Sequence, residues 1–207
     1  MRSCKILSHE NDLPENVVVG SSVAIDTETG GLNLHRDRLC VIQLAFDDGS
    51  CHIVQIKKNA TSAPNLQKIL TNVDITKIFH FGRFDIAILY QTFGVLTQNV
   101  YCTKIASKLV RTYTEKHGLK TLCRELIGVE ISKEQQSSDW AANVLSEAQK
   151  VYASQDVIYL HDLMKILNEK LHRENRYEMA EQCFKFLPYR ALLDCKGWNN
   201  EDIFAHI

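Results

Sequence analysis

The stretch SSVAIDTETGGL, residues Ser21–Leu32, begins as an apolar strand and then carries two carboxylates. After the apolar run at 23–25, Asp26 and Glu28 are separated by a single residue. Side chains two positions apart on a strand point to the same face. Like charges held side by side raise each other's pKa and destabilise a fold unless a positive group lies between them. The stretch therefore predicts a strand whose end binds something cationic.

The composition is that of a globular protein with a sizeable core. The 207 residues are 45% hydrophobic and 24% charged, and the formal net charge is −1. No run approaches the roughly 18 apolar residues of a membrane span, and residues 1–16 lack the pattern of a secretory signal. Seven cysteines without a CxxC pair favour reduced thiols over disulfides or a zinc site. We therefore expect a cytoplasmic protein without a membrane partner.

Strand patterns dominate the first part of the chain and helical patterns the second. Three β-branched-rich runs at 22–29, 38–46 and 51–56 are separated by Gly30-Gly31 and by a turn at 47–49. The other predicted elements are a strand at 76–81 and helices at 63–72, 83–93, 102–110, 118–128 and 146–175, the last beginning after an N-cap at Ser146. This order predicts an α/β fold with a mixed sheet flanked by helices. We expect one domain over 1–207, with a core at about 17–170 and a helical tail at about 171–207.

Two of the predicted helices place an acid on the apolar face. Asp85 shares a helical stripe with Phe81 and Ile88, and Asp156 shares one with Tyr152 and Leu163. A buried carboxylate must be paired with a base, lie at the edge of a cleft or bind a cation.

A cation would also relieve the repulsion between Asp26 and Glu28. Oxygen ligands without cysteine or imidazole point to Mg²⁺ or Mn²⁺. Three or four carboxylates can hold two such ions, the arrangement that hydrolyses phosphodiester bonds. Tyr152, four residues before Asp156 and on the same helix face, could orient an attacking water or help to remove its proton.

Several other groups have two interpretations each. A basic run is either a solvated helix surface or a patch that follows phosphates; its members are Lys104, Lys108, Arg111, Lys116, Lys120 and Arg124. Arg83 either contacts a phosphate or forms a surface ion pair. His80 is either a structural hydrogen-bonding residue at a strand end or a substrate contact.

The segments DTETGGL, HFGRFD and YASQD occur in the order of the three motifs of the DEDD superfamily of 3′–5′ exonucleases. The chain resembles the tyrosine branch of that superfamily, and SSDW…LSEAQKVYASQDVIYL is similar to the corresponding stretch of ribonuclease D. The resemblance implies a ribonuclease-H-like exonuclease fold and two divalent cations, Mg²⁺ or Mn²⁺. It implies that the metal ligands are Asp26, Glu28, Asp85 and Asp156, with Tyr152 beside the attacking water.

The resemblance also implies substrate contacts. Thr27 and Leu32 match residues that touch the 3′-terminal nucleotide in related proofreading domains. Many relatives have Asn four residues before the second-motif acid, where this chain has Phe81 preceded by His80. The expected function is a two-metal 3′–5′ exoribonuclease that releases nucleoside 5′-monophosphates from single-stranded RNA ends, in RNA 3′-end processing or degradation. DNA is the alternative substrate, a catalytically inactive nucleic-acid-binding module is a further alternative, and the sequence does not determine the oligomeric state.

Overall fold

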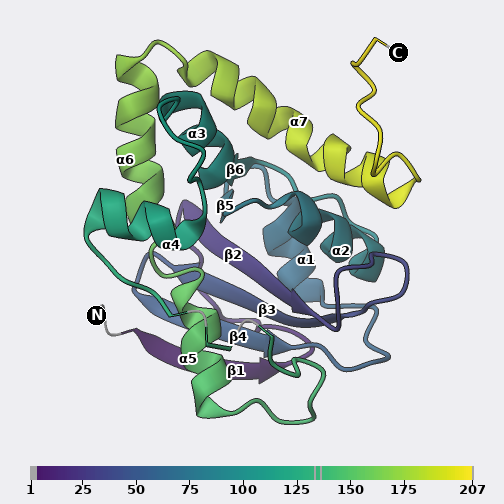
Figure 1. Cartoon of the computed structure of the whole chain (residues 1–207). Helices are drawn as coiled ribbons and strands as arrows, with labels where there is room; N and C mark the ends of the chain where they lie inside the picture. Colours follow the sequence, from purple (N-terminus) through teal and green to yellow (C-terminus); the bar gives the residue numbers. More distant parts are fainter. Residues whose placement is uncertain (1–3, 133, 136, 207) are drawn as a thin grey trace.

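The structure, a computed structural model, describes residues 4–132, 134, 135 and 137–206. Residues 1–3 of the expected domain and Ile207 at the end of the expected tail lie outside these ranges. Within the described residues, a sheet of six strands has the order β1-β4-β3-β2-β5-β6 (Figure 1). The strands are β1 Lys5–Glu10, β2 Ser22–Thr29, β3 Leu39–Phe46, β4 Ser50–Gln55, β5 Thr76–Phe79 and β6 Val100–Cys102.

The three strands predicted at 22–29, 38–46 and 51–56 are confirmed as β2, β3 and β4, which pair antiparallel in this order. Gly49, with φ of 83°, adopts the left-handed conformation in the turn that joins β3 to β4. The structure adds two strands that run parallel to their neighbours, β1 beside β4 and β6 beside β5. Because β2 also pairs in parallel with β5, the sheet is mixed. Every residue of β3 is buried, so the core lies around this strand and β2.

Helices cover the sheet, as expected for the α/β class. They are α1 Pro64–Thr71, α2 Arg83–Phe93, α3 Thr103–Val110, α4 Leu119–Leu122, the π-helical turn η1 Cys123–Ile127, α5 Glu147–Gln155, α6 Leu160–Arg173 and α7 Tyr177–Cys195. Helix α5 contacts β1, β3 and β4, whereas α7 packs along α2, α3 and β6 (Figure 1). No helix among the described residues is long and apolar enough to cross a membrane.

The prediction of one continuous helix over 146–175 is wrong. The chain leaves the helix after Gln155 and re-enters it at Leu160. The backbone N–H groups of Val157 and Ile158 both donate to the carbonyl of Ser154, at 3.2 and 3.1 Å, and this shared acceptor closes a tight turn. Asp156 consequently lies at the C-terminal end of α5 and not within a helix.

The tail differs from the prediction in a similar way. The expected helix over 171–207 is α7, which begins at Tyr177 and ends at Cys195, while the expected boundary near 170 falls inside α6. Gly197 has φ of 104°, and the N–H of Trp198 reaches back to the carbonyl of Leu193 at 3.0 Å. A glycine in this conformation with a bond from the next residue is the common way to end a helix. The described residues beyond it are not helical.

Candidate metal centre and substrate pocket

Strand β2 brings the first two acids to the centre of the molecule. Its first four residues are buried, while Asp26 and Glu28 are half-buried near its C-terminal end. Because side chains alternate along a strand, both carboxylates project from the same face. Leu32, the predicted substrate contact four residues beyond Glu28, is 86% exposed.

Helix α2 supplies the third acid from its first turn. Asp85 is 7% exposed, and the positive end of a helix dipole favours a carboxylate at this position. Gly82, the residue before the helix, permits the close approach of α2 to β5, because a Cβ there would lie 2.5 Å from Cβ of Phe79. The hydroxyl of Thr27 donates a 2.6 Å hydrogen bond to Oδ1 of Asp85. The second motif is thereby joined directly to the first.

Helix α5 supplies Tyr152 and Asp156. The predicted N-cap at Ser146 is confirmed, and Gln149 completes a reciprocal capping box with it. Tyr152 is buried, and its ring packs against that of Trp140 with 6.0 Å between centroids. One helical turn later, Asp156 ends the helix. The cap fixes where α5 begins, and the aromatic contact packs the helix against the segment before it.

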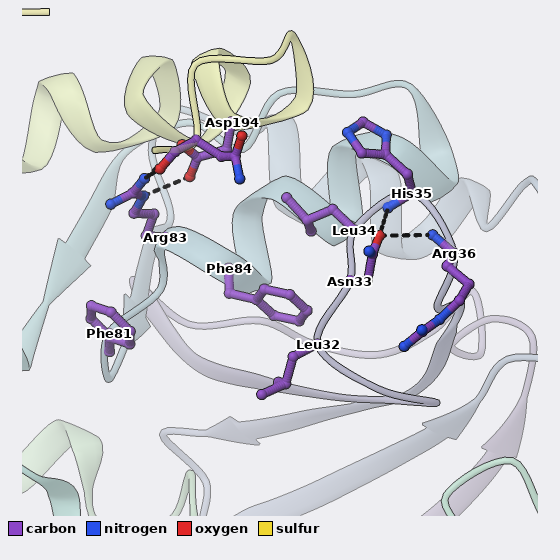
Figure 2. Close-up of a pocket in the computed structure, with 10 residues that line it drawn as sticks. Leu32, Asn33, Leu34, His35, Arg36, Phe81, Arg83, Phe84 and Asp194 are labelled. Carbon is purple, nitrogen blue, oxygen red and sulfur yellow. Dashed lines mark hydrogen bonds and ion pairs between the residues drawn. The ribbon is translucent and has the colours of Figure 1, made fainter. Parts of the chain in front are cut away.

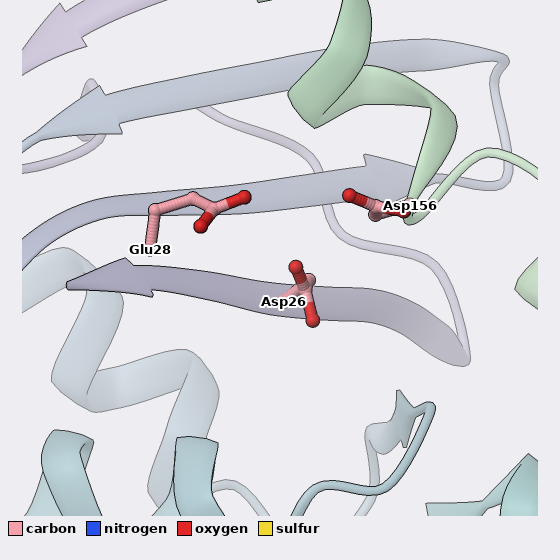
Figure 3. A group of neighbouring side chains, drawn as sticks. All are labelled: Asp26, Glu28 and Asp156. Atoms are coloured by element: carbon pink, nitrogen blue, oxygen red, sulfur yellow. The ribbon is translucent and has the colours of Figure 1, made fainter. Parts of the chain in front are cut away.

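Three of the four predicted metal ligands come together directly. Asp26, Glu28 and Asp156 each offer a carboxylate oxygen, and these atoms all lie within 4.8 Å of one another. Figure 3 shows the Asp156 carboxylate directed toward the two acids of β2. Asp85 lies outside this group of three but adds to the repulsion that Asp26 experiences.

The electrostatics of the cluster are those of crowded anions. Burial, followed by repulsion from Asp156 and Asp85, raises the pKa of Glu28 to about 8. Burial raises the pKa of Asp156 to about 7, with repulsion from Asp85 adding to it, and burial raises that of Asp85 to about 6. The pKa of Asp26 is also raised well above its ordinary value, by burial and then by the other three acids. Each shift disfavours the ionised form in the absence of a positive charge.

The donor set fits a hard divalent cation. Among the described residues, no Lys, Arg or His forms an ion pair with any of the four acids. Their negative charge is therefore not balanced by a basic side chain of the described chain. Gln43 lies opposite Asp26 in the β2–β3 register and is fully buried. Neither its amide nitrogen nor its amide oxygen has a hydrogen-bond partner in the described chain. Carboxylates beside an unpaired amide suit a hydrated Mg²⁺ or Mn²⁺.

A pocket of about 550 Å³ is lined in part by the segments that carry the acids of β2 and α2 (Figure 2). Its size is within the roughly 300–1,000 Å³ of small-molecule sites. Its walls come from the segment after β2, from the start of α2 and from the end of α7, and the ten lining residues are Leu32, Asn33, Leu34, His35, Arg36, Phe81, Arg83, Phe84, Asp194 and Asn199. Of the predicted substrate contacts, Leu32 lines this pocket, whereas the Thr27 hydroxyl is bound to Asp85.

His80 has a structural partner. The hydroxyl of Thr103 donates to the carbonyl of Phe79 at 3.2 Å, so it accepts a hydrogen bond from Nδ1–H of His80 at 2.9 Å. Burial, with a smaller contribution from Lys104, lowers the pKa of His80 to about 3, and the ring is neutral. His80 does not line the pocket. A substrate contact by His80 remains a prediction.

Two features of the pocket depart from the sequence pattern. The prediction that Phe81 belongs to the buried stripe of α2 is wrong, because Phe81 precedes the helix and is 51% exposed. Arg83 forms an ion pair, which the sequence left as one of two alternatives. Its guanidinium binds both carboxylate oxygens of Asp194, at 2.6 and 2.7 Å, and Arg190 binds the same carboxylate at 2.8 Å.

No short-range signal could have found this ion pair, since 111 residues separate Arg83 from Asp194. The basic run at 104–124 likewise includes a residue that fits neither sequence-based alternative. Arg111 is 1% exposed, and it donates to the carbonyl of Lys116 and to the carboxylate of Glu125. This arginine is part of the internal packing.

Comparisons with known proteins agree with this geometry. The profile of a 3′–5′ exonuclease family matches residues 2–172. Ribonuclease D of Gluconacetobacter diazotrophicus is 34% identical over 156 residues, which are 75% of this chain and 39% of that protein. The chain thus spans about two fifths of the length of the curated relatives it matches.

Solved structures extend the likeness over nearly the whole chain. Brucella melitensis NrnC bound to pGG has a TM-score of 0.95 and 57% identity, covering 99% of this chain and 100% of that one. The structure of the same Brucella protein with bound Mg²⁺ has a TM-score of 0.93, 56% identity and coverage of 98% and 100%. Escherichia coli RNase D has a TM-score of 0.72 and 26% identity, covering 83% of this chain and 46% of that one. This chain belongs to the DEDD family of 3′–5′ exonucleases and is a hydrolase of the ribonuclease D and NrnC type.

Proposed function

We propose that this protein is a metal-dependent exoribonuclease that hydrolyses phosphodiester bonds at single-stranded RNA 3′ ends and releases nucleoside 5′-monophosphates. The observation that carries the proposal is the approach of Asp26, Glu28 and Asp156 to within 4.8 Å of one another, beside the buried Asp85. We place the activity in RNA 3′-end processing or degradation. The free state of all seven cysteines supports a cytoplasmic location.

In this proposal the four acids hold two divalent cations, Mg²⁺ or Mn²⁺. Such ions supply Lewis-acid stabilisation of charge on phosphate oxygens and promote ionisation of a water. The protein contributes a preformed cage, because the Thr27–Asp85 hydrogen bond joins β2 to α2 and the Trp140–Tyr152 contact packs α5 against the segment before it. The binding of Mg²⁺ by the Brucella relative supports the choice of metal.

Tyr152 is assigned to the attacking water. Its hydroxyl lies on the same helix as Asp156, and burial together with the nearby Asp156, Glu28 and Asp26 carboxylates raises its pKa. A phenol with a raised pKa stays protonated near neutral pH. We therefore assign to Tyr152 the orientation of the water by hydrogen bonding, and not removal of its proton.

RNA is the proposed substrate because the curated relatives include ribonuclease D proteins and because the Brucella relative binds pGG. DNA is the second candidate, since a DNA polymerase I of Aquifex aeolicus is 32% identical over 161 residues. We further propose that residues 1–207 act as one exonuclease domain, in which α7 completes the pocket through Asp194.

The test is digestion of matched RNA and DNA oligonucleotides with free or blocked 3′ ends, in Mg²⁺, Mn²⁺ or EDTA. We expect stepwise shortening of RNA from a free 3′ end, release of nucleoside 5′-monophosphates and no reaction in EDTA. Asp26→Asn should abolish the activity and keep the fold, whereas the exposed Asp74→Asn serves as the matched control. Faster digestion of DNA would move the assignment to the second candidate. An inactive wild-type protein that still binds RNA would support a binding module instead.

A further inference from the structure

Phe81 combines a strained backbone with an exposed aromatic ring at the edge of the pocket. Its φ is 65°, in the left-handed region, which is uncommon for any residue other than glycine and a clear outlier for a bulky side chain. Such conformations persist only where the surroundings impose them, and they cluster at functional sites. The half-exposed ring of Phe81 gains little from burial, so packing does not explain why an aromatic residue occupies this position.

The residues on both sides hold Phe81 in this conformation. His80, immediately before it, is anchored to Thr103 at the start of α3. Gly82, immediately after it, is packed so closely on Phe79 that a larger residue there would clash. The ring is therefore presented by a rigid turn between β5 and α2, two residues before Arg83 and four before Asp85.

One face of the Phe81 ring is covered by a cation. Nζ of Lys104, in the first turn of α3, lies 3.7 Å from the ring centroid. Among the described residues, no carboxylate forms an ion pair with Lys104. The ammonium group is consequently held in place by the ring while its charge stays available to an anion.

The rest of the ring borders the same pocket as two other apolar side chains. Phe81, Phe84 and Leu32 all line it, and in Figure 2 Phe84 lies above Leu32 while Phe81 lies to the left of both. Leu32 follows β2 after Glu28, and Phe84 directly precedes Asp85, so two residues that line the pocket belong to the segments that carry the acids.

We propose that Phe81 and Lys104 form a nucleotide-binding platform, in which the ring stacks on a base of the RNA and the ammonium group binds an adjacent phosphate. This inference rests on the proposed function, since it names a contact for the same substrate. An aromatic face accepts any base, and a neighbouring fixed cation provides the charge that single-stranded nucleic acids require. The platform contributes to substrate affinity without discriminating strongly between base sequences.

Phe81→Gly tests the platform because stability and binding should change in different directions. Glycine adopts the left-handed conformation without strain, so the free energy of unfolding should be unchanged or higher. The affinity for a short single-stranded RNA should fall by about 5- to 150-fold, the range that loss of one base–aromatic stack produces. Phe81→Trp should retain affinity within about threefold. The matched control is Tyr189→Ala, which removes an exposed aromatic ring of α7 outside this pocket.

The measurement is calorimetric titration with short RNA in Ca²⁺, with gels to show that the RNA stays intact. The titration is repeated with RNAs that lack one base at a time. Phe81→Gly should cause no loss of affinity for the RNA that lacks the stacked base. This result is the sign of direct coupling in a double-mutant cycle. An equal loss with every abasic RNA, or no loss with any RNA, would overturn the platform.

The role of Lys104 is tested by separate variants. Lys104→Gln should weaken RNA binding and make the slope of log K against log salt concentration shallower by about one. Lys104→Arg should restore both the affinity and the slope. Unaltered salt dependence would remove Lys104 from the proposal. Because binding is measured without turnover, these results are distinct from those for the proposed function. Normal cleavage with no effect of Phe81→Gly rejects only the platform, and absent cleavage with the expected binding losses rejects only the exonuclease assignment.

Discussion

The hydroxyl of Thr27 donates a 2.6 Å hydrogen bond to the carboxylate of Asp85. Thr27 lies between Asp26 and Glu28 on β2, whereas Asp85 comes from the first turn of α2. The bond lowers the pKa of Asp85 and so opposes the effect of burial, which is the larger influence on this group. It keeps the fourth acid oriented and more easily ionised beside the other three.

Thr27→Val should therefore weaken divalent-cation binding while preserving the shape of the side chain. Loss of a partner that orients a metal ligand typically costs about 10- to 100-fold in metal affinity or activity. Calorimetric titration with Mn²⁺ and the rate of RNA shortening measure both effects. Thr27→Ser keeps the hydroxyl and should restore most of the affinity. Equal behaviour of the valine and serine variants would show that the hydrogen bond does not orient Asp85.

The buried amide of Gln43 supports a second prediction. Because it is unpaired among the described residues and lies opposite Asp26, it costs stability unless the occupied centre provides a partner. Gln43→Met should raise the free energy of unfolding in EDTA by about 1 kcal/mol. The same variant should lower Mn²⁺ affinity by about tenfold or more.

For Gln43→Met, chemical denaturation measures the free energy of unfolding, and calorimetry measures the Mn²⁺ affinity. The exposed Gln91→Met on α2 provides the control, in which neither quantity should change. A variant that is less stable in EDTA and binds Mn²⁺ normally would show that Gln43 is a structural residue without a role at the metal centre.

Tyr152→Phe removes only a hydroxyl group from the packed ring. The contact between the ring of residue 152 and that of Trp140 should be retained. The free energy of unfolding and the Mn²⁺ affinity should therefore stay close to those of the wild type. The rate of RNA cleavage at saturating substrate should fall by about 100-fold, as for loss of the group that orients the attacking water. If metal affinity falls in parallel with the rate, the hydroxyl supports the metal centre instead of the water.

Much of the site could be predicted because its signals are local. The D-x-E pattern needs only the alternation of a strand to bring Asp26 and Glu28 to one face, and the S-E-A-Q sequence is sufficient for the cap at Ser146. The break after Gln155 was missed because the apolar pattern continues through it with helical spacing. The turn is imposed by the packing of α5 on the sheet and of α6 on β2 and β5.

Contacts between segments far apart in the chain could not be predicted from local sequence patterns. The partner of Arg83 is fixed by the way α7 crosses α2, and no pattern near either residue encodes that crossing. Strand β6 has only three residues, too few to display a period, and it exists because β5 offers it an edge. Phe81 fitted a helical stripe in the sequence, but the left-handed turn before α2 directs its side chain outward.

The crowded acids predict how stability depends on pH. The pKa values of Asp85, Asp156 and Glu28 in the folded protein are about 6, 7 and 8, above the ordinary values of 3.8 for aspartate and 4.5 for glutamate. The folded chain therefore binds more protons than the unfolded chain between about pH 4 and pH 8. The stabilising contribution of these groups is complete below about pH 4 and is lost as the pH rises through 6 to 8.

In EDTA, the free energy of unfolding should consequently fall by several kcal/mol between pH 5 and pH 8. Asp156→Asn removes one negative charge from the cluster and should make the fall shallower, whereas Asp74→Asn, at an exposed position, should leave it unchanged. Saturating Mn²⁺ should restore stability most strongly at pH 8, because the cation binds the ionised acids and only in the folded chain. Denaturation at several pH values, with and without Mn²⁺, measures each of these effects. A pH dependence that is the same for the wild type and Asp156→Asn would mean that repulsion within the cluster does not govern it, and the metal centre would lose its electrostatic basis.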